Sequence, residues 1–300
     1  MSSWKISVYA SKPVIQQALL AHDDLWEWDP DLVISGSEIA PNRPQEWVLE
    51  AWYPRKPAAK QKNAIASLFA DDAPELTVEK LPDEDWLVLS QQGVDPISAG
   101  RFYVRTPEHE PAGKAGICDI VIPASQAFGT GQHETTAGCL AVLDAMKASG
   151  VVARNIADIG TGTGLLAFAA LELWPGALAT ASDIDPICTG VVEENAALNG
   201  VTLGARHGEC TMVVADGMQD ALLKARGPYD LLIANILAGP LVELAEDFAQ
   251  AITPGGQLLL AGLLKTQEAK VRRAYRARGF RLAARLVNGD WSILWLRKRR

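Results

Sequence analysis

The sequence predicts an α/β protein whose mostly parallel sheet carries helices on both faces and follows a smaller α+β domain. From residue 117 onward, strand-like apolar runs alternate with helical patterns, which is typical of such a sheet. One of these runs ends in a glycine-rich loop, residues 160–164, that leads directly into a helical pattern. The chain before residue 82 instead shows the order β-α-β-β-α-β of a ferredoxin-like unit.

Length and composition limit the possible functions. The 300 residues can form two domains, and a hydrophobic fraction of 48% is ordinary for a globular protein. The net charge of −8 lacks the basic field that most nucleic-acid binders use, and the basic residues 297–300 are interpreted as a solvated end. The four scattered cysteines indicate reduced thiols and no metal site. Without a leader-like or membrane-spanning run, we expect a cytoplasmic monomer that contacts neither membrane nor nucleic acid.

The first domain is predicted to span residues 1–81. Residues 4–10 alternate like a strand, and Ser11 caps a helix that has Pro13 in its first turn. The following runs predict strands at 32–39 and 47–53, a helix at 58–69 and a strand at 76–81. No catalytic group stands out, so this domain is interpreted as a substrate-recognition domain. Residues 82–116, rich in proline, glycine and acids, are interpreted as a linker with one short strand near 101–105.

The second domain is predicted to span residues 117–300. Its strands are expected at 118–122, 156–159, 177–182, 211–215, 229–234, 258–261, 281–287 and 291–296. Its helices are expected at 137–147, 165–173, 187–199, 218–224, 241–251 and 267–278. The last two strands meet at Asn288-Gly289, a turn typical of a hairpin, and predict an antiparallel edge to the sheet.

Ligands of such sheets bind beyond the carboxyl ends of the strands, where the strand order reverses. The strand at 156–159 ends in the loop 160–164, whose glycines allow unusual dihedral angles or close approach to a ligand. The helix that follows also offers free N–H groups at its N-terminus. An ordinary tight strand–helix turn has the same pattern, so the other strand ends must decide.

Polar side chains stand at the next three strand ends. Asp183 is placed to accept hydrogen bonds from ribose hydroxyls, whereas Asp185 is interpreted as the cap of the following helix. Asp216 ends the third strand, where it would meet the amino group of an adenine, and Asn235 ends the fourth. Their order along the chain indicates a nucleoside pocket.

The glycine spacing helps to choose the ligand. Dinucleotide folds use G-x-G-x-x-G to bring a pyrophosphate to the helix N-terminus, whereas residues 160–164 form G-x-G-x-G and follow Asp158. A carboxylate at Asp158 repels a pyrophosphate and suits a cation or an amine, although a bond to local backbone explains Asp158 alone equally well. The combination favours S-adenosylmethionine over NAD.

Residues 157–166, Asp183 and Asn235 resemble class I S-adenosylmethionine-dependent methyltransferases, which have a Rossmann-like sheet. Residues 128–136 (FGTGQHETT) and 235–241 (NILAGPL) further resemble the PrmA family, which methylates protein eleven of the large ribosomal subunit. The resemblance is strong from residue 117 and weaker before it, where the family's small recognition domain agrees with the ferredoxin-like pattern. Several relatives carry a second tryptophan in the linker, which is missing after Trp86.

This resemblance implies a protein-lysine N-methyltransferase that modifies lysine side-chain and N-terminal amines of a large-subunit ribosomal protein. Together with the strand-end pattern, it gives the expected cofactor-binding residues Thr136, Gly160, Gly162, Asp183, Asp216 and Asn235. No catalytic base is assigned: Asn235 is expected to orient the amine or the cofactor, and His133 is interpreted as a packing or capping residue.

Other functions fit less well. A class I methyltransferase acting on RNA or on another small or protein substrate is the main alternative. Enzymes that methylate nucleic-acid adenine or glutamine would normally show Asn-Pro-Pro-aromatic where Asn235 is followed by Ile-Leu-Ala. The glycine spacing and Asp158 oppose an NAD-dependent dehydrogenase, and the presence of both Asp183 and Asn235 opposes a non-catalytic module.

Overall fold

The computed structural model describes residues 4–23, 33–40, 43, 45–53, 55–69, 74–80, 95–123 and 132–300. The chain divides into two compact units, Met1–Val88 and Leu89–Arg300. Trp86, residues 128–131 and the side chain of His133 lie outside the described part. No described helix is both long and apolar enough to cross a membrane.

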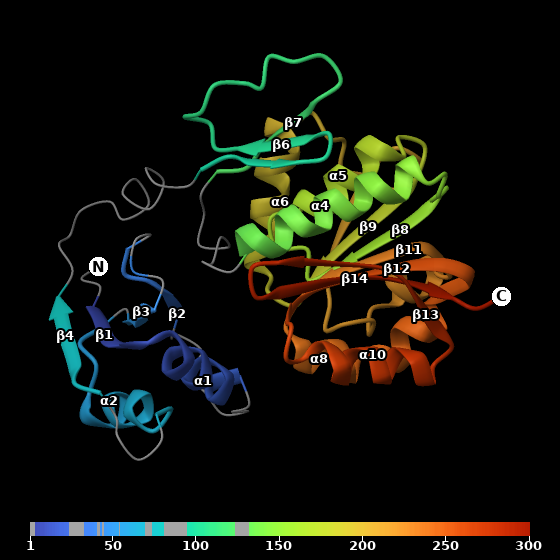
Figure 1. Cartoon of the computed structure of the whole chain (residues 1–300). Coiled ribbons are helices and arrows are strands. Elements are labelled where there is room, and N and C mark those ends of the chain that lie inside the picture. The colour runs from blue at the N-terminus through green and yellow to red at the C-terminus, as the bar shows by residue number, and fades with distance from the viewer. Residues whose placement is uncertain are drawn as a thin grey trace. The chain divides into compact units, whose positions relative to one another are not determined.

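The described residues of the first unit form a four-stranded antiparallel sheet with two helices (Figure 1). Its elements are β1 (Trp4–Ser11), α1 (Lys12–Asp23), β2 (Val33–Glu38), β3 (Glu46–Tyr53), α2 (Ala59–Ala66) and β4 (Leu76–Lys80). The strand order β2-β3-β1-β4 puts the first and third strands at the centre. Ile15 of α1 and Ile65 of α2 share one core with Ile6 and Leu49 of these central strands. The predicted ferredoxin-like unit is therefore confirmed.

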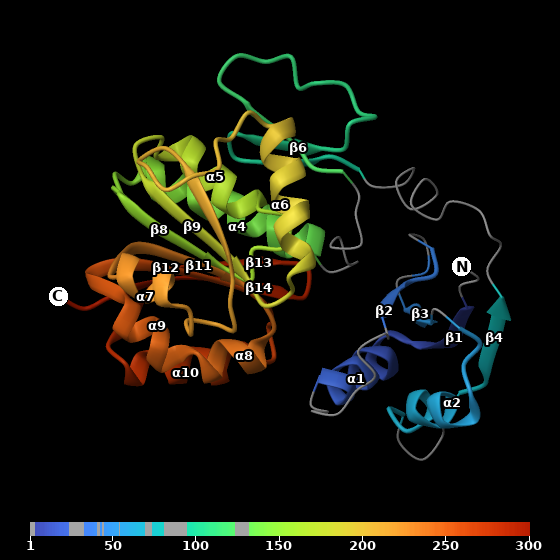
Figure 2. The same ribbon diagram turned by 180° about the vertical axis from the view of Figure 1, so that it is seen from behind.

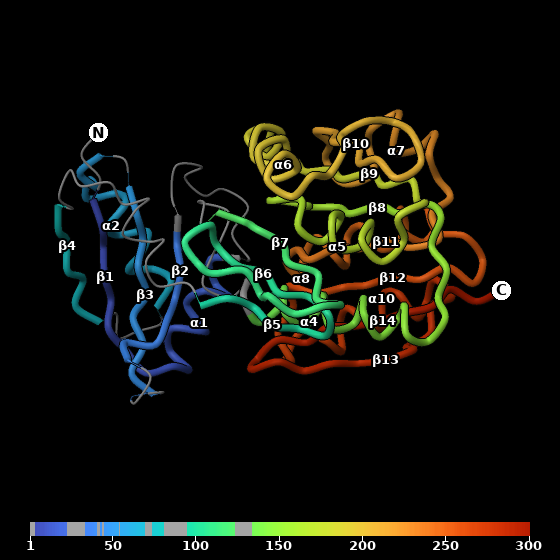
Figure 3. Tube along the Cα trace, turned by 90° about the horizontal axis from the view of Figure 1, so that it is seen from above, coloured from blue at the N-terminus to red at the C-terminus, as the bar shows by residue number. Residues whose placement is uncertain are grey.

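The second unit is built on a seven-stranded sheet of order β10-β9-β8-β11-β12-β14-β13, seen from above in Figure 3. The strands are β8 (Asn155–Ile159), β9 (Leu178–Asp183), β10 (Cys210–Val214), β11 (Tyr229–Asn235), β12 (Ile252–Leu264), β13 (Phe280–Asn288) and β14 (Trp291–Lys298). The first five strands in this order run parallel, and β14 runs antiparallel to both of its neighbours, β12 and β13. The sheet with an antiparallel edge is therefore as predicted, and its order reverses between β8 and β11.

Helices cover both faces of this sheet, as Figures 1 and 2 show. They are α4 (Gln132–Ala148), α5 (Leu165–Leu173), α6 (Ile187–Leu198), α7 (Ala221–Arg226), α8 (Ala238–Glu243), α9 (Ala245–Ala251) and α10 (Glu268–Ala277). Leu140 of α4 and Phe168 of α5 lie in one buried core. Phe248 of α9 and Tyr275 of α10 lie in a second core on the opposite face. The predicted α/β class is confirmed.

Three predicted elements differ most from the structure, and the helix predicted at 218–224 begins three residues later, at Ala221. Helix α4 begins five residues before the predicted start, and the helix predicted at 241–251 is two short helices that meet at Leu244. Strand β12 is much longer than predicted, because the Pro-Gly-Gly run that resembles a turn is taken up by a register shift against β11. Such an irregularity lets a strand accept residues that a regular ladder excludes.

A third sheet lies partly within the residues predicted as a linker. It contains β5 (Ile97–Ala99), β6 (Phe102–Arg105) and β7 (Cys118–Val121). Strand β6 confirms the short strand expected near 101–105. Phe102 and Val104 are buried in the core that holds α4, and Arg101 Nε donates to Asp144 Oδ1 of α4 over 2.6 Å. Residues 97–105 therefore pack as part of the second unit, because their alternating apolar side chains need a core to cover them.

Candidate active site

The register of the central strands places three predicted residues at the same level along the strand direction. Ile159, the last residue of β8, pairs with the residue before Asp183 in β9 and with the residue before Asn235 in β11. Gly160, Asp183 and Asn235 therefore follow side by side at the carboxyl edge of the parallel strands. This edge is where the strand order reverses, which is the usual ligand position in such sheets.

The remaining predicted residues are placed differently. Gly162 lies in the glycine loop and Asp216 lies exposed, two residues beyond the end of the neighbouring strand β10. Thr136 lies in α4, which packs on β12 and β14, and its side chain is buried. Within the described part of the chain, no polar contact joins Thr136 to the other five residues. Five of the six predicted residues thus share one edge, and the sixth belongs to a covering helix.

The three loop glycines all have positive φ, but their surroundings differ. Gly160 has φ +73°, and a Cβ there would overlap the side chain of Ile236. Gly164 has φ +82° at the start of α5, where a Cβ would stand 2.6 Å from the ring of Phe168. Gly162 has φ +54°, but a Cβ there would meet no heavy atom within 4 Å. Packing within the chain accounts for the first two, whereas the open space at Gly162 is available to a ligand.

The end of β11 is fixed by glycines on both of its sides. The side chain of Ile236 covers Gly160, and its backbone lies against Gly262, where a Cβ would overlap the carbonyl oxygen of Ile236. Gly262 also has φ +81°, at the register shift in β12. Backbone packing on both sides of Ile236 therefore fixes the position of the neighbouring Asn235. Leu237, two residues further, is 50% exposed.

Asp183 joins the end of β9 to the glycine loop. Gly162 N donates to its Oδ2 over 2.8 Å, and Asp185 N donates to its Oδ1 over 3.1 Å. Each carboxylate oxygen retains acceptor capacity, since it can take two hydrogen bonds. Asp185 accepts a hydrogen bond from Ile187 N over 2.9 Å at the start of α6, in line with its expected capping role.

Asp158 is a buried carboxylate with one unused oxygen. Its Oδ2 accepts hydrogen bonds from Thr161 Oγ1 (2.6 Å) and Ala167 N (3.1 Å), so the expected bond to local backbone is present. Its Oδ1 is buried and has no hydrogen-bond partner among the described residues. Burial, aided by the negative charge of Asp183, raises the pKa of Asp158 to about 7. A cationic group nearby would favour the ionised form of Asp158, and a phosphate nearby would disfavour it.

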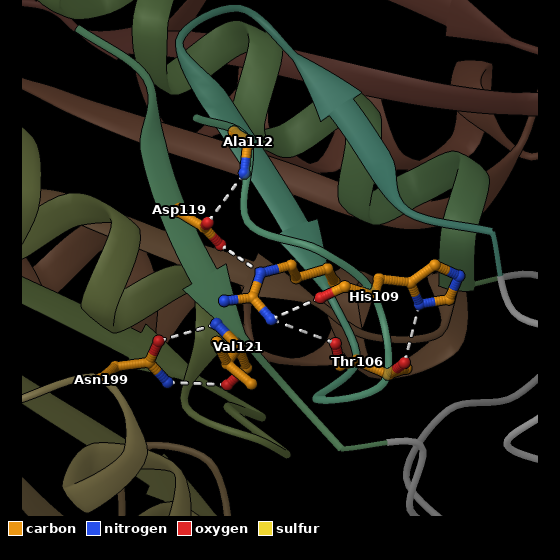
Figure 4. Close-up of polar contacts among 7 residues, drawn as sticks. Thr106, His109, Ala112, Asp119, Val121 and Asn199 are labelled. Atoms are coloured by element: carbon orange, nitrogen blue, oxygen red, sulfur yellow. Dashed lines mark hydrogen bonds and ion pairs between the residues drawn. The ribbon is translucent and has the colours of Figure 1, made fainter. Parts of the chain in front are cut away.

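Sequence reasoning missed two asparagines that brace this edge, Asn195 of α6 and Asn199, which caps the C-terminus of that helix. Asn195 is buried, and its Nδ2 donates to Thr163 O of the glycine loop over 2.9 Å. The amide of Asn199 accepts from Val121 N and donates to Val121 O, both over 2.7 Å (Figure 4). Helix α6 therefore ties the glycine loop to the end of β7. Their spacing of one helical turn is the available sequence signal.

Strand β7, whose Val121 is hydrogen-bonded to Asn199, is also held by a network of polar contacts. Arg105 Nε of β6 donates to Asp119 Oδ1 of β7 over 2.8 Å, and Ala112 N donates to Asp119 Oδ2 over 3.1 Å. Arg105 Nη1 also donates to the backbone oxygen of His109 over 2.8 Å (Figure 4). The loop between β6 and β7 is therefore folded back on its own strands, which fixes where β7 ends.

The two glycines with unequal surroundings give a matched test. Gly160→Ala should lower the free energy of unfolding by at least about 1 kcal/mol more than Gly162→Ala, because only the first methyl group must displace Ile236. Both variants carry the penalty of positive φ, roughly 1–2 kcal/mol. Urea unfolding of the two variants measures the difference. Equal destabilisation would contradict the packing role of Gly160.

Asp158 should make stability fall as the pH rises. Its folded-state pKa of about 7 lies above the ordinary value of 3.8, so the folded protein holds a proton that the unfolded chain lacks between these values. This contribution is complete below the ordinary pKa and is lost as the pH approaches the folded-state pKa. Urea unfolding at several pH values should show a weaker decline for Asp158→Asn than for the native chain. Identical pH slopes would contradict the buried proton.

Comparisons with known proteins agree with this geometry. The model of the family described as ribosomal protein L11 methyltransferase (PrmA) matches residues 18–299. The chain is 36% identical to the ribosomal protein L11 methyltransferase of Agrobacterium fabrum over 273 residues, 90% of each chain. It is 35% identical to that of Rhizobium meliloti over 298 residues, 99% of each chain. The solved ribosomal protein L11 methylase of Lactobacillus delbrueckii subsp. bulgaricus has a TM-score of 0.57 and 26% identity, with 69% of this chain and 99% of that chain covered. The chain belongs to the PrmA family of ribosomal protein L11 methyltransferases.

Proposed function

We propose that this protein transfers methyl groups from S-adenosylmethionine to lysine side-chain and N-terminal amines of the large-subunit ribosomal protein L11. Family membership supports the reaction class and the substrate, since the relatives are named for both. The observation that carries the proposal in the structure is the single row of Gly160, Asp183 and Asn235 at the edge where the strand order reverses. In this row, the cofactor's nucleoside would bind at Gly160 and Asp183, and the substrate's amine would bind at the adjacent Asn235.

The residues at this edge fit S-adenosylmethionine. Three carboxylates, of Asp158, Asp183 and Asp216, stand at successive strand ends, and such a set suits a cationic ligand rather than a pyrophosphate. A nearby ammonium group would favour the ionised form of Asp158, and the space over Gly162 allows close backbone approach. When bound, S-adenosylmethionine supplies a methyl group on a sulfonium sulfur, which is an activated leaving group.

Each residue has a role that follows from its position. Asp183 accepts hydrogen bonds from the ribose hydroxyls while it keeps its bond to Gly162. Asp216, at the neighbouring strand end, accepts from the amino group of the adenine. Thr136 completes the site from α4, as the family resemblance implies. These assignments predict a bound nucleoside that lies along the strand ends from β8 toward β10.

The attacking amine must be neutral, although a lysine with a pKa of about 10 is mostly protonated at neutral pH. Asn235 is half-buried and offers an amide oxygen, which can accept a hydrogen bond from a neutral amine and leave its lone pair free to attack. The exposed Leu237 provides an apolar surface beside it, which would desolvate the amine and lower its pKa. Positioning and desolvation, rather than a dedicated base, then promote the transfer.

The first unit is proposed to recognise the protein substrate. Its ferredoxin-like sheet forms a core of its own, and the cofactor site is proposed for the second unit alone. The division proposed from the sequence is a recognition domain at 1–81, a linker from 82 and a methyltransferase domain ending at 300. A monomeric enzyme of the cytoplasm is the expected form, because ribosomal proteins are made there.

Asp183→Ala should weaken S-adenosylmethionine binding by roughly 1–3 kcal/mol, because it leaves ribose hydroxyls without an acceptor. Calorimetric titration of the purified full-length chain measures this loss. Asp185→Ala is the matched control: it removes a carboxylate two residues away whose observed partner is Ile187 N of α6, and it should leave the affinity nearly unchanged. Unchanged affinity in Asp183→Ala would contradict the placement of the ribose.

Deletion of residues 1–80 should preserve S-adenosylmethionine binding and abolish methylation of intact L11. Radiolabelled S-adenosylmethionine, incubated with the native chain and a ribosomal extract, should label one protein band that co-migrates with purified L11. Full activity of the truncated chain would exclude the recognition role of the first unit. Labelled RNA in place of protein would support the alternative RNA methyltransferase.

A further inference from the structure

A concentrated basic surface lies far from the residues described above. It consists of two adjoining hollows of about 430 Å³ and 440 Å³ that share Arg281. The first also contains Arg272, Arg273 and Arg276 of α10, and the second also contains residues 297–300. We call this set of eight arginine and lysine side chains the basic groove. Apart from Lys298, which is half-buried, all of them are exposed.

The basic groove is positively charged, whereas the chain as a whole is negatively charged. No carboxylate is among the described residues that line either hollow, and every residue that lines the second hollow is cationic. The chain as a whole has a net charge of −8. The rest of the surface is therefore still more acidic, so a polyanion would be repelled elsewhere and attracted to this one region.

Like charges are held close together within the basic groove. Arg281 of β13 stands directly opposite Arg297 of β14, and Arg276 lies one turn after Arg272 in α10. Such pairs are destabilising in a sheet and in a helix. Among these four, only Arg272 has a carboxylate partner in the described part of the chain, Glu268 at 3.0 Å. A bound anion would relieve the repulsion.

The basic groove and the cofactor site lie at opposite edges of the sheet. Arg297 pairs with Gln257 in the middle of β12 and residues 298–300 continue from it toward the amino edge, whereas Asn235 pairs with Ala261 nearer the carboxyl end of β12. Arg299 N donates to Gly279 O over 3.0 Å, so the end of the chain is held beside the end of α10. A ligand in the basic groove would leave the carboxyl edge of the strands free.

We propose that the basic groove binds the phosphate backbone of RNA. Seven of its eight cations are arginines, whose planar forks match phosphate oxygens. Leu282 is the large apolar side chain exposed among the lining residues, and an acidic peptide or a membrane would need more apolar anchors. The choice of RNA rests on the proposed function, because a ribosomal protein substrate is found beside ribosomal RNA. This assignment replaces two expectations from the sequence, the solvated end at 297–300 and the lack of contact with nucleic acid.

Fluorescence anisotropy with a labelled fragment of large-subunit ribosomal RNA tests this proposal without any methyl transfer. The native full-length chain should bind the RNA with an affinity that falls steeply as salt is added. Replacement of four arginines by glutamine, Arg281→Gln, Arg297→Gln, Arg299→Gln and Arg300→Gln, should weaken binding at least tenfold and flatten the salt dependence. S-adenosylmethionine binding by calorimetry should be unchanged in this variant, because the basic groove lies at the other edge.

The matched control removes four exposed cations of the second unit that lie outside the basic groove: Lys114→Gln, Arg154→Gln, Arg206→Gln and Lys224→Gln. It changes the net charge equally and should bind RNA within about threefold of the native chain. Equal losses in both variants, or no RNA binding by the native chain at low salt, would overturn the proposal. Tighter binding to polyglutamate or to anionic phospholipid vesicles than to RNA would also overturn it. Neither result depends on whether L11 is methylated.

Discussion

The position of β8 between β9 and β11 is the constraint on which the functional edge depends. Because β8 is paired on both sides, its last residue sets the height at which Gly160, Asp183 and Asn235 leave the sheet. The bond from Gly162 N to Asp183 and the wedge of Ile236 between Gly160 and Gly262 then keep the three strand ends together. A shift of one residue in this register would turn every one of these side chains to the other face.

The sequence predicted what depends on local residue order. The glycine loop, the acidic strand ends and the alternating elements are properties of short segments, and they predicted the sheet and the position of five of the named residues at its carboxyl edge. The bracing by Asn195 and Asn199 depends on which segments α6 meets, and single-sequence patterns do not contain that information. Strand β5 was not predicted for the same reason. A short apolar run within a proline-rich stretch becomes a strand only where a core covers it.

The distribution of charge over the surface also could not be predicted from the sequence alone. The net charge is a sum over the chain, and it hides the difference between the acidic carboxyl edge and the basic groove at the amino edge of the same sheet. The run at 297–300 is visible in the sequence, but the opposition of Arg281 and Arg297 follows from the hairpin register. The arginines of α10 join them because Gly279 holds the end of the chain beside that helix.

The two hydrogen bonds between Asn199 and Val121 affect an exposed strand edge of the protein. Strand β7 is an edge of its three-stranded sheet, and an open strand edge is a template on which a second chain can add a strand. At Val121 the side-chain amide of Asn199 satisfies both the N–H and the carbonyl group, as a neighbouring strand would. The Asn199 side chain at the end of α6 thereby occupies the backbone groups of Val121 that a strand from another copy would need, which disfavours pairing at this position.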